Sequence, residues 1–268
     1  MILEVDFSGF GVRLRGEDPV LEQLRELWAP FLGAVHEPVL DVRVERTEGE
    51  IPPGRHLEGG LQETREGGAR RLARVEGSIE LGSGRAAVLR IPGGEDARRL
   101  WGGINLVVAA LGDALPARGG LLIHGAAALL DGRVFLLSGP SGAGKTTWAR
   151  ACAAAGLPIL SDDAVLVDAG ADPPHALGAP FRARDFQAPG RGRWPLAAVL
   201  LPQHGTPALS QASVLRASAV LQANALFASA HDRHVEDLVH RLVTRVPVRT
   251  LTYPPDPSFL PLLRDFAA

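Results

Sequence analysis

The sequence predicts an α/β protein with a smaller β-rich domain at its amino end. Apolar and polar residues alternate in short stretches over the first 48 residues, which is typical of strands with one buried face. Composition changes near Glu95, after a segment rich in Gly and Arg. Beyond it, short apolar runs alternate with helical patterns, as in a sheet covered by helices. We therefore expect a β-rich domain over residues 1–95 and an α/β domain over residues 96–268.

The amino-terminal domain is expected to combine strands with one helix. Apolar residues recur at helical spacing between Pro19 and Leu32, with Asp18 as the N-cap and Pro19 at the first helical position. Residues 49–95 are interpreted as hairpins joined by loops. The predicted strands of this domain are Ile2–Phe7, Val12–Leu14, Val39–Val44, Leu72–Val75, Ser78–Leu81 and Ala86–Ile91.

The second domain is predicted to alternate strands with helices. An Asp131-Gly132 turn joins two buried strands, and Gly156 ends the helix that begins at Lys145. Residues 170–195 are irregular and rich in Pro, Gly and Arg. Irregular segments of this length are uncommon in compact domains unless they have a function. The predicted strands are 119–124, 134–137, 158–160, 165–167, 197–201 and 246–253, and the predicted helices are 96–111, 145–155, 217–229, 233–244 and 257–266.

The composition is that of a globular protein without a strong charge preference. Apolar residues make up 46% and charged residues 22%, and the formal charge of −2 gives no attraction to nucleic acid or anionic membrane. Apolar stretches stop well short of about 18 residues, so no transmembrane helix is expected. An acidic residue at position 4, without a basic segment, argues against a signal peptide. The single cysteine, Cys152, excludes an internal disulfide, so we expect a cytoplasmic protein.

Only one of the 28 basic side chains is a lysine, and it lies in a glycine-rich loop of the Walker A pattern. Glycines at this spacing let backbone N–H groups converge on phosphate oxygens, and the helix that follows adds partial positive charge. Lys145 is predicted to bridge the β- and γ-phosphates of ATP, and Thr146 to ligate Mg²⁺. The structural alternative is a turn that caps a helix. The predicted nucleotide-binding residues are Gly139, Ser141, Gly142, Ala143, Gly144, Lys145, Thr146 and Thr147.

An acidic pair and a histidine complete the candidate site. Asp162 and Asp163 follow a predicted strand, 17 and 18 residues after Lys145. One carboxylate can hold Mg²⁺ or its waters while the other accepts a proton from an attacking hydroxyl. His124 ends an apolar strand 15 residues before Gly139, where it orients a catalytic carboxylate or merely packs. A solvated turn is the structural alternative for the pair.

Other candidates have structural alternatives of equal or greater weight. Four arginines in the irregular segment either supply positive charge to a transition state or lie in a solvated loop. Two histidines and two acidic residues near residue 234 resemble a metal site. The favoured interpretation is that they are ordinary polar residues at the start of a helix. Cys152 lies on the apolar helix after the glycine-rich loop and is expected to be a packing residue. The residues concerned are Arg182, Arg184, Arg191 and Arg193, and His231, Asp232, His234 and Glu236.

With these residues in order, the stretch from Ile123-His-Gly-Ala through Leu137-Ser-Gly-Pro-Ser-Gly-Ala-Gly-Lys-Thr-Thr to Ile159-Leu-Ser-Asp-Asp-Ala-Val resembles the catalytic domain of HPr kinase/phosphorylase. It looks closest to related serine kinases of bacterial biosynthetic clusters, including those that tailor lasso-type peptides. The resemblance covers residues 123–167. It implies a P-loop kinase fold akin to phosphoenolpyruvate carboxykinase. The family's later Glu-Arg-Gly motif has no clear match, and Arg182 to Arg193 occupy about its place.

The resemblance also implies a role for each matched residue. Asp162 is the base on a substrate serine hydroxyl, with His124 beside it. Asp163 assists the metal. Lys145, Ser141 and Thr146 handle the phosphates and Mg²⁺. The resemblance does not by itself imply a hexamer, and a homo-oligomer stays open.

The leading hypothesis is an ATP- and Mg²⁺-dependent kinase that phosphorylates a hydroxyl, above all serine, of a peptide, protein or small molecule. The alternative is a P-loop ATPase or nucleotide-dependent switch, in which Asp162 positions water. A carboxykinase is excluded because that class needs a metal-ligating lysine besides its P-loop lysine, and this chain has only Lys145. Residues 1–95 are expected to recognise the partner, and neither nucleic acid nor membrane is expected to bind.

Overall fold

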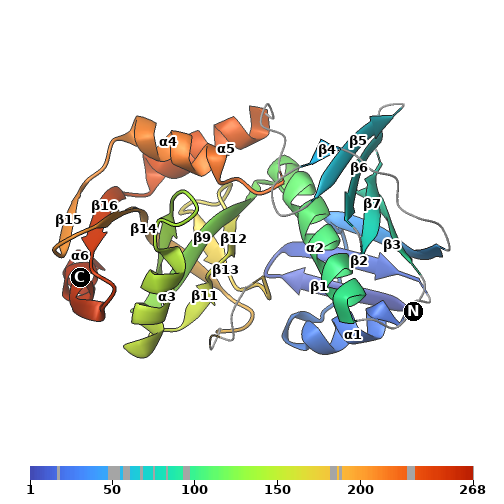
Figure 1. Cartoon of the computed structure of the whole chain (residues 1–268), viewed down its shortest axis with the longest axis horizontal. Helices are drawn as coiled ribbons and strands as arrows, with labels where there is room; N and C mark the ends of the chain where they lie inside the picture. Colours follow the sequence, from blue (N-terminus) through green and yellow to red (C-terminus); the bar gives the residue numbers. More distant parts are fainter. Residues whose placement is uncertain are drawn as a thin grey trace. The chain divides into compact units, whose positions relative to one another are not determined.

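The computed structural model divides the chain into two compact units, Met1–Ala114 and Leu115–Ala268 (Figure 1). Each unit contains one sheet, and six α-helices lie within the described part of the chain, so the predicted α/β class is confirmed. The structure describes residues 1–16, 19–47, 55–56, 61–66, 69–74, 76–82, 84–92, 97–181, 186, 189–227 and 233–267.

Unit 1 is built on eight strands in the order β1-β2-β3-β8-β7-β6-β5-β4. The β2–β3 and β3–β8 pairs are parallel and the others are antiparallel. Each of the six predicted strands corresponds to one of these eight, β1 with the predicted bounds and the others with shifted bounds, whereas β4 and β5 were not predicted. The eight strands are β1 (Ile2–Phe7), β2 (Phe10–Arg15), β3 (Leu40–Thr47), β4 (Arg55–His56), β5 (Gln62–Glu66), β6 (Ala69–Arg74), β7 (Gly77–Leu81) and β8 (Ala86–Pro92).

The described part of unit 1 contains two α-helices. Helix α1 (Val20–Leu27) is shorter than predicted, because Pro30 disfavours α-helical backbone at the residue before it and the chain continues as a short 3₁₀ helix. The N-cap predicted at Asp18 lies outside the described residues. Helix α2 (Ala97–Ala114) packs on β7 and β8 through buried Leu106 and Leu111. Sequence analysis assigned this helix to the second domain, whereas the structure places it in unit 1.

Unit 2 has a sheet in which β9 is longer than predicted, because the nearly continuous apolar run continues past His124 as far as the turn at Asp131 and Gly132. Strand β13 lies inside the segment that sequence analysis interpreted as irregular, and β15 was not predicted. The strands are β9 (Gly120–Leu130), β10 (Arg133–Ser138), β11 (Ile159–Ser161), β12 (Ala164–Asp168), β13 (His175–Leu177), β14 (Arg193–His204), β15 (Ala208–Gln211) and β16 (Val248–Tyr253).

Strand pairing in unit 2 closes on itself. Strand β9 pairs with β12 through residues 120–124 and with β10 through residues 125–130. Strand β14 then joins β10 to β13, and β13 pairs with β12. Strands β10, β14 and β16 are neighbours and parallel, so their carboxyl ends lie at one edge of the sheet.

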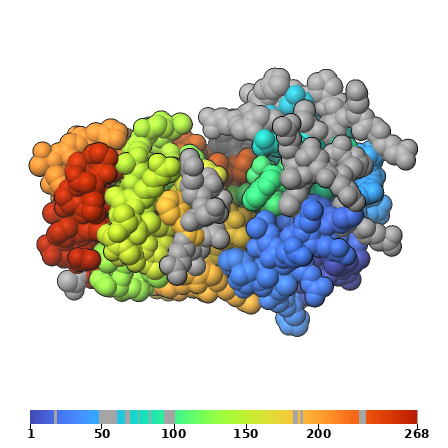
Figure 2. All heavy atoms as spheres, turned by 60° about the horizontal axis from the view of Figure 1, so that its bottom comes forward, coloured from blue at the N-terminus to red at the C-terminus, as the bar shows by residue number. Residues whose placement is uncertain are grey.

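Helices cover both faces of β10, whose side chains alternate between two apolar clusters. Val134 and Leu136 belong to a cluster with α4 and α5, whereas Phe135 and Leu137 belong to a cluster with α3 and α6. The surfaces of α3 and of the carboxyl-terminal residues adjoin (Figure 2). The helices are α3 (Lys145–Ala154), α4 (Val214–Ala223), α5 (Arg233–Arg245) and α6 (Leu260–Ala267), with 3₁₀ turns Pro116–Arg118 and Pro257–Phe259. No helix that the structure describes could cross a membrane.

Candidate phosphate-binding site

The glycine-rich loop connects the carboxyl end of β10 to the first residue of α3. Gly142 and Gly144 have φ values of 78° and 91°, in the left-handed region that favours glycine. Gly139 meets a different constraint, because a Cβ there would lie 2.7 Å from Pro202 Cγ. The loop conformation therefore requires all three glycines. Another residue would strain the backbone at Gly142 and Gly144, and its Cβ would have no space at Gly139.

Lys145 is the first residue of α3 and is buried beneath this loop. Its ammonium donates to the carbonyl oxygens of Gly139 and Pro140, at 2.8 and 3.0 Å. Burial lowers the pKa of Lys145, and the negative charge of Asp163 opposes that shift. The structure thus holds the lysine within the loop, whose outer residues Ser141 and Gly142 are exposed.

The acidic pair lies in the turn after β11, with its two side chains in different environments. Asp162 is buried, whereas the side chain of Asp163 is 53% exposed. Asp163 is the residue that meets His124: its carbonyl oxygen lies 2.9 Å and its carboxylate Oδ1 3.3 Å from His124 Nδ1. The Gly125 N–H also donates to the Asp163 carbonyl, at 3.0 Å. The family resemblance implied His124 beside Asp162, whereas in the structure the imidazole of His124 contacts Asp163, the next residue.

Register explains why these groups meet. His124 is paired with Ala164 of β12, and Gly125 with Ser138, the last residue of β10. The histidine, the acidic turn and the start of the glycine-rich loop are therefore neighbours across β9. The structure brings together His124, the acidic turn and the glycine-rich loop, which come from separate segments of the chain.

Two buried serines that sequence analysis did not select hold this arrangement. The Ser161 hydroxyl accepts from the N–H groups of Asp163 and Ala164, at 3.1 and 3.0 Å, and donates to the carbonyl of Phe181. The Ser138 hydroxyl donates to the His124 carbonyl, at 3.1 Å. A serine next to an acidic pair is the sequence signal for such a turn, because its short side chain bonds local backbone.

A histidine and a tyrosine lie on the other side of the glycine-rich loop, and sequence analysis missed both. His204 ends β14 and Tyr253 ends β16, paired in register. A Cβ on Gly144 would lie 3.0 Å from the Tyr253 hydroxyl and 3.2 Å from His204 Cε1. The Tyr253 hydroxyl lies 3.5 Å from the Ala143 carbonyl, and burial raises the pKa of Tyr253 to about 12. Both positions are ends of parallel strands, where α/β sheets bind ligands.

The described residues of the arginine-rich segment are placed by their hydrogen bonds. Phe181, at its start, bonds to Ser161, but Arg182 and Arg184 lie outside the described residues. Arg193 begins β14, at the end opposite to His204, and donates to Asp168 at 2.6 Å. Because the glycine-rich loop lies near the carboxyl end of β14, Arg193, at the amino end, is not brought to the candidate site.

The remaining candidates also lie elsewhere. His231 and Asp232 are outside the described residues, and His234 and Glu236 are exposed on the first turn of α5. Within the described ranges, no group of three or more His, Cys, Asp or Glu side chains is placed to hold a metal. Cys152 is buried in α3, as expected, and burial raises the pKa of its thiol.

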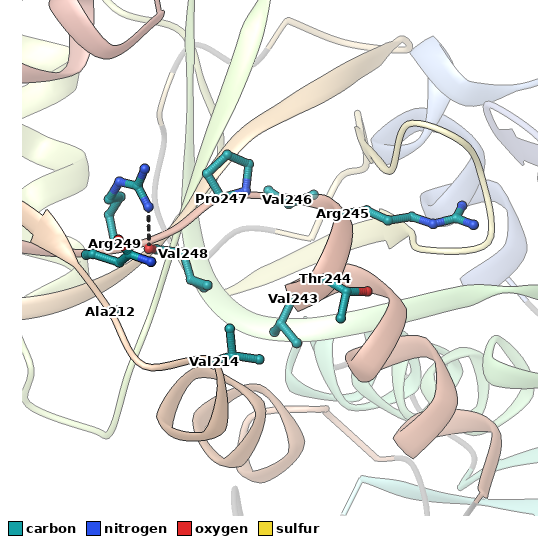
Figure 3. Close-up of a pocket in the computed structure, with 10 residues that line it drawn as sticks. Ala212, Val214, Val243, Thr244, Arg245, Val246, Pro247, Val248 and Arg249 are labelled. Carbon is teal, nitrogen blue, oxygen red and sulfur yellow. Dashed lines mark hydrogen bonds between the residues drawn. The ribbon is translucent and has the colours of Figure 1, made fainter.

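A pocket of about 320 Å³ lies between the end of α5 and the start of α4 (Figure 3). It faces the amino end of β16, where Arg249 donates to the Val248 carbonyl at 3.0 Å. Tyr253, which borders the glycine-rich loop, is at the carboxyl end of that strand. This pocket is therefore separate from the candidate site. Its lining residues are Gln211, Ala212, Val214 and residues 243–249.

Comparison with known proteins adds no family assignment. No protein-family model matches the chain, and no curated protein matches it.

The residues of the site fit a magnesium nucleotide. The loop supplies left-handed glycines and a buried ammonium, which suit the negative charge of phosphates. The half-buried hydroxyl of Thr146 and the exposed carboxylate of Asp163 are oxygen ligands of the kind Mg²⁺ prefers.

Proposed function

We propose that the protein is an ATP- and Mg²⁺-dependent kinase that transfers the γ-phosphoryl group of ATP to a hydroxyl, chiefly serine, of a peptide, protein or small molecule. The observation that carries the proposal is the position of the acidic turn and His124 beside the glycine-rich loop that contains Lys145. The resemblance of residues 123–167 to HPr kinase/phosphorylase supports the same activity.

ATP would bind to groups that lie close together in the folded chain, at the glycine-rich loop and the start of α3. Backbone N–H groups of the loop and the start of α3 attract phosphate oxygens. The Lys145 ammonium bonds to the carbonyls of Gly139 and Pro140, and a phosphate would compete for its protons. When bound, Mg²⁺ neutralises phosphate charge, and Thr146 and Asp163 would hold it.

Transfer to a hydroxyl requires a proton acceptor, and we assign this role to Asp162. The acceptor oxygen forms a bond to the γ-phosphorus, the bond to the bridging oxygen of ADP breaks, and the hydroxyl proton passes to the carboxylate. Asp163 and His124, bonded to each other, hold the turn that carries Asp162. That residues 1–95 recognise the acceptor stays a prediction.

The proposal is tested by label transfer from γ-labelled ATP to candidate hydroxyl acceptors. Asp162→Asn should lower acceptor labelling by about 100-fold or more while ATP affinity stays within about two-fold, since general-base catalysis contributes about this much. Asp131→Asn, in an exposed turn, is the matched control and should behave as wild type. Normal labelling by Asp162→Asn would remove Asp162 as the base. ATP hydrolysis without labelling of any acceptor would favour the ATPase or switch instead.

A further inference from the structure

The end of β10 is flanked by different groups on its two sides. Strand β9 brings His124 and, through its contacts, Asp163 to one side. On the other side, β14 and β16 bring His204 and Tyr253 against Gly144. The glycine-rich loop thus lies between an acidic side and an aromatic side.

This asymmetry gives a direction to the nucleotide of the proposed function. The γ-phosphate must face the carboxylates if one of them is to act as the base. The rest of the nucleotide then extends away from β9, over the carboxyl ends of β14 and β16. Ligands of open α/β sheets lie in the crevice beyond such parallel strand ends.

His204 is an exposed aromatic group at these strand ends. Its side chain is exposed at the last position of β14, whereas Tyr253 is buried. The Tyr253 ring packs against Phe259, with centroids 5.4 Å apart, and lies 6.2 Å from the imidazole of His204. Tyr253 therefore supports the loop and the histidine from below, and His204 presents a ring to solvent beside Gly144.

We infer that His204 forms a stacking surface for the nucleobase of the bound nucleotide. The inference rests on the proposed function, and it adds a base-binding position to a site that otherwise contacts phosphates. Stacking on a flat ring is tolerant of base identity, because each base has a π-face. The chain should therefore discriminate weakly between ATP and GTP.

The test compares ATP with inorganic tripolyphosphate, which has the phosphates but no base. His204→Ala should weaken ATP binding by about ten-fold in titration calorimetry with Mg²⁺, in line with the loss of one base-stacking contact. Tripolyphosphate affinity should stay within about two-fold. His204→Phe retains a flat ring and should bind ATP nearly as wild type. His240→Ala removes an exposed histidine on α5 and is the matched control.

Each outcome bears on the stacking role. Equal weakening of ATP and tripolyphosphate in His204→Ala would overturn it, because His204 would then act on the phosphates or on the loop. Unchanged ATP affinity would also overturn it. Since the assay measures binding alone, a stacking role that holds while label transfer fails would contradict only the kinase activity. A wild-type chain that binds neither ligand would remove both proposals.

Discussion

The Nδ1 atom of His124 lies 2.9 Å from the Asp163 carbonyl oxygen and 3.3 Å from the carboxylate Oδ1 of the same residue. A carbonyl oxygen only accepts, so Nδ1 carries the proton and donates. In the neutral ring, Nε2 then keeps its lone pair. This bond ties the acidic turn to β9, and its geometry leads to a first prediction.

His124→Asn is expected to preserve most of the activity that His124→Ala loses. The amide nitrogen of asparagine takes nearly the position of Nδ1 and can still donate to the Asp163 carbonyl. We expect label transfer to fall by about ten-fold in His124→Ala and by less than about three-fold in His124→Asn, as for loss of one hydrogen bond that positions a reacting group. Initial rates at saturating ATP measure this. If both variants are equally impaired, Nε2 has a direct role.

Gly144→Ala should damage the phosphate site more than Gly142→Ala. Both residues have left-handed φ values, so each substitution strains the backbone by about 1 kcal/mol. A Cβ on Gly144 would also meet Tyr253 and His204, whereas no described residue beyond its chain neighbours lies within 4 Å of a Cβ on Gly142. Calorimetry should show ATP affinity lower by about ten-fold or more for Gly144→Ala, and by about five-fold for Gly142→Ala. Equal losses would show that the close approach has no effect.

Ser161→Ala is expected to loosen the acidic turn. Its buried hydroxyl makes three bonds to backbone groups of Asp163, Ala164 and Phe181. Their loss should lower the free energy of unfolding by about 3 kcal/mol, from about 1 kcal/mol for each bond, and should reduce kcat more than ATP affinity. Urea unfolding and label transfer measure the two effects. Ser210→Ala, exposed on β15, is the control and should change neither.

The alkaline titration of Tyr253 can be followed without interference, because the chain has one tyrosine. Burial raises its pKa from 10.0 to about 12, so the folded state keeps a proton that the unfolded state releases. The stabilisation is complete below pH 10 and is lost as pH rises towards 12. Phenolate absorbance should show a midpoint near pH 12 in the native protein and near pH 10 in urea.

Tyr253→Phe cannot ionise at this position. Between pH 10 and 12, its unfolding free energy should fall by roughly 2 kcal/mol less than that of the wild type. A native midpoint near pH 10 would contradict the burial of this hydroxyl.

Local sequence was sufficient to predict the glycine-rich loop and its two flanking elements, but it predicted other elements of this unit less accurately. The strand before the loop and the helix that Gly156 ends are found where they were predicted, because glycine conformations and helix ends depend on near neighbours. Helix α4 (Val214–Ala223) begins three residues before the predicted start at 217 and ends six residues before the predicted end at 229. Strand β13 escaped notice because three residues give too short a pattern to recognise.

The sequence by itself determined the α/β class, the loop with its single lysine, and the acidic pair with His124 as candidates. Only the tertiary structure decided which carboxyl residue bonds to His124, that Arg193 is far from the loop, and that His204 and Tyr253 border it. Apolar periodicity and glycine spacing act within a few residues, so they can be read along the chain. Strand neighbours and register arise from packing between distant segments, and the site is assembled from the ends of those strands.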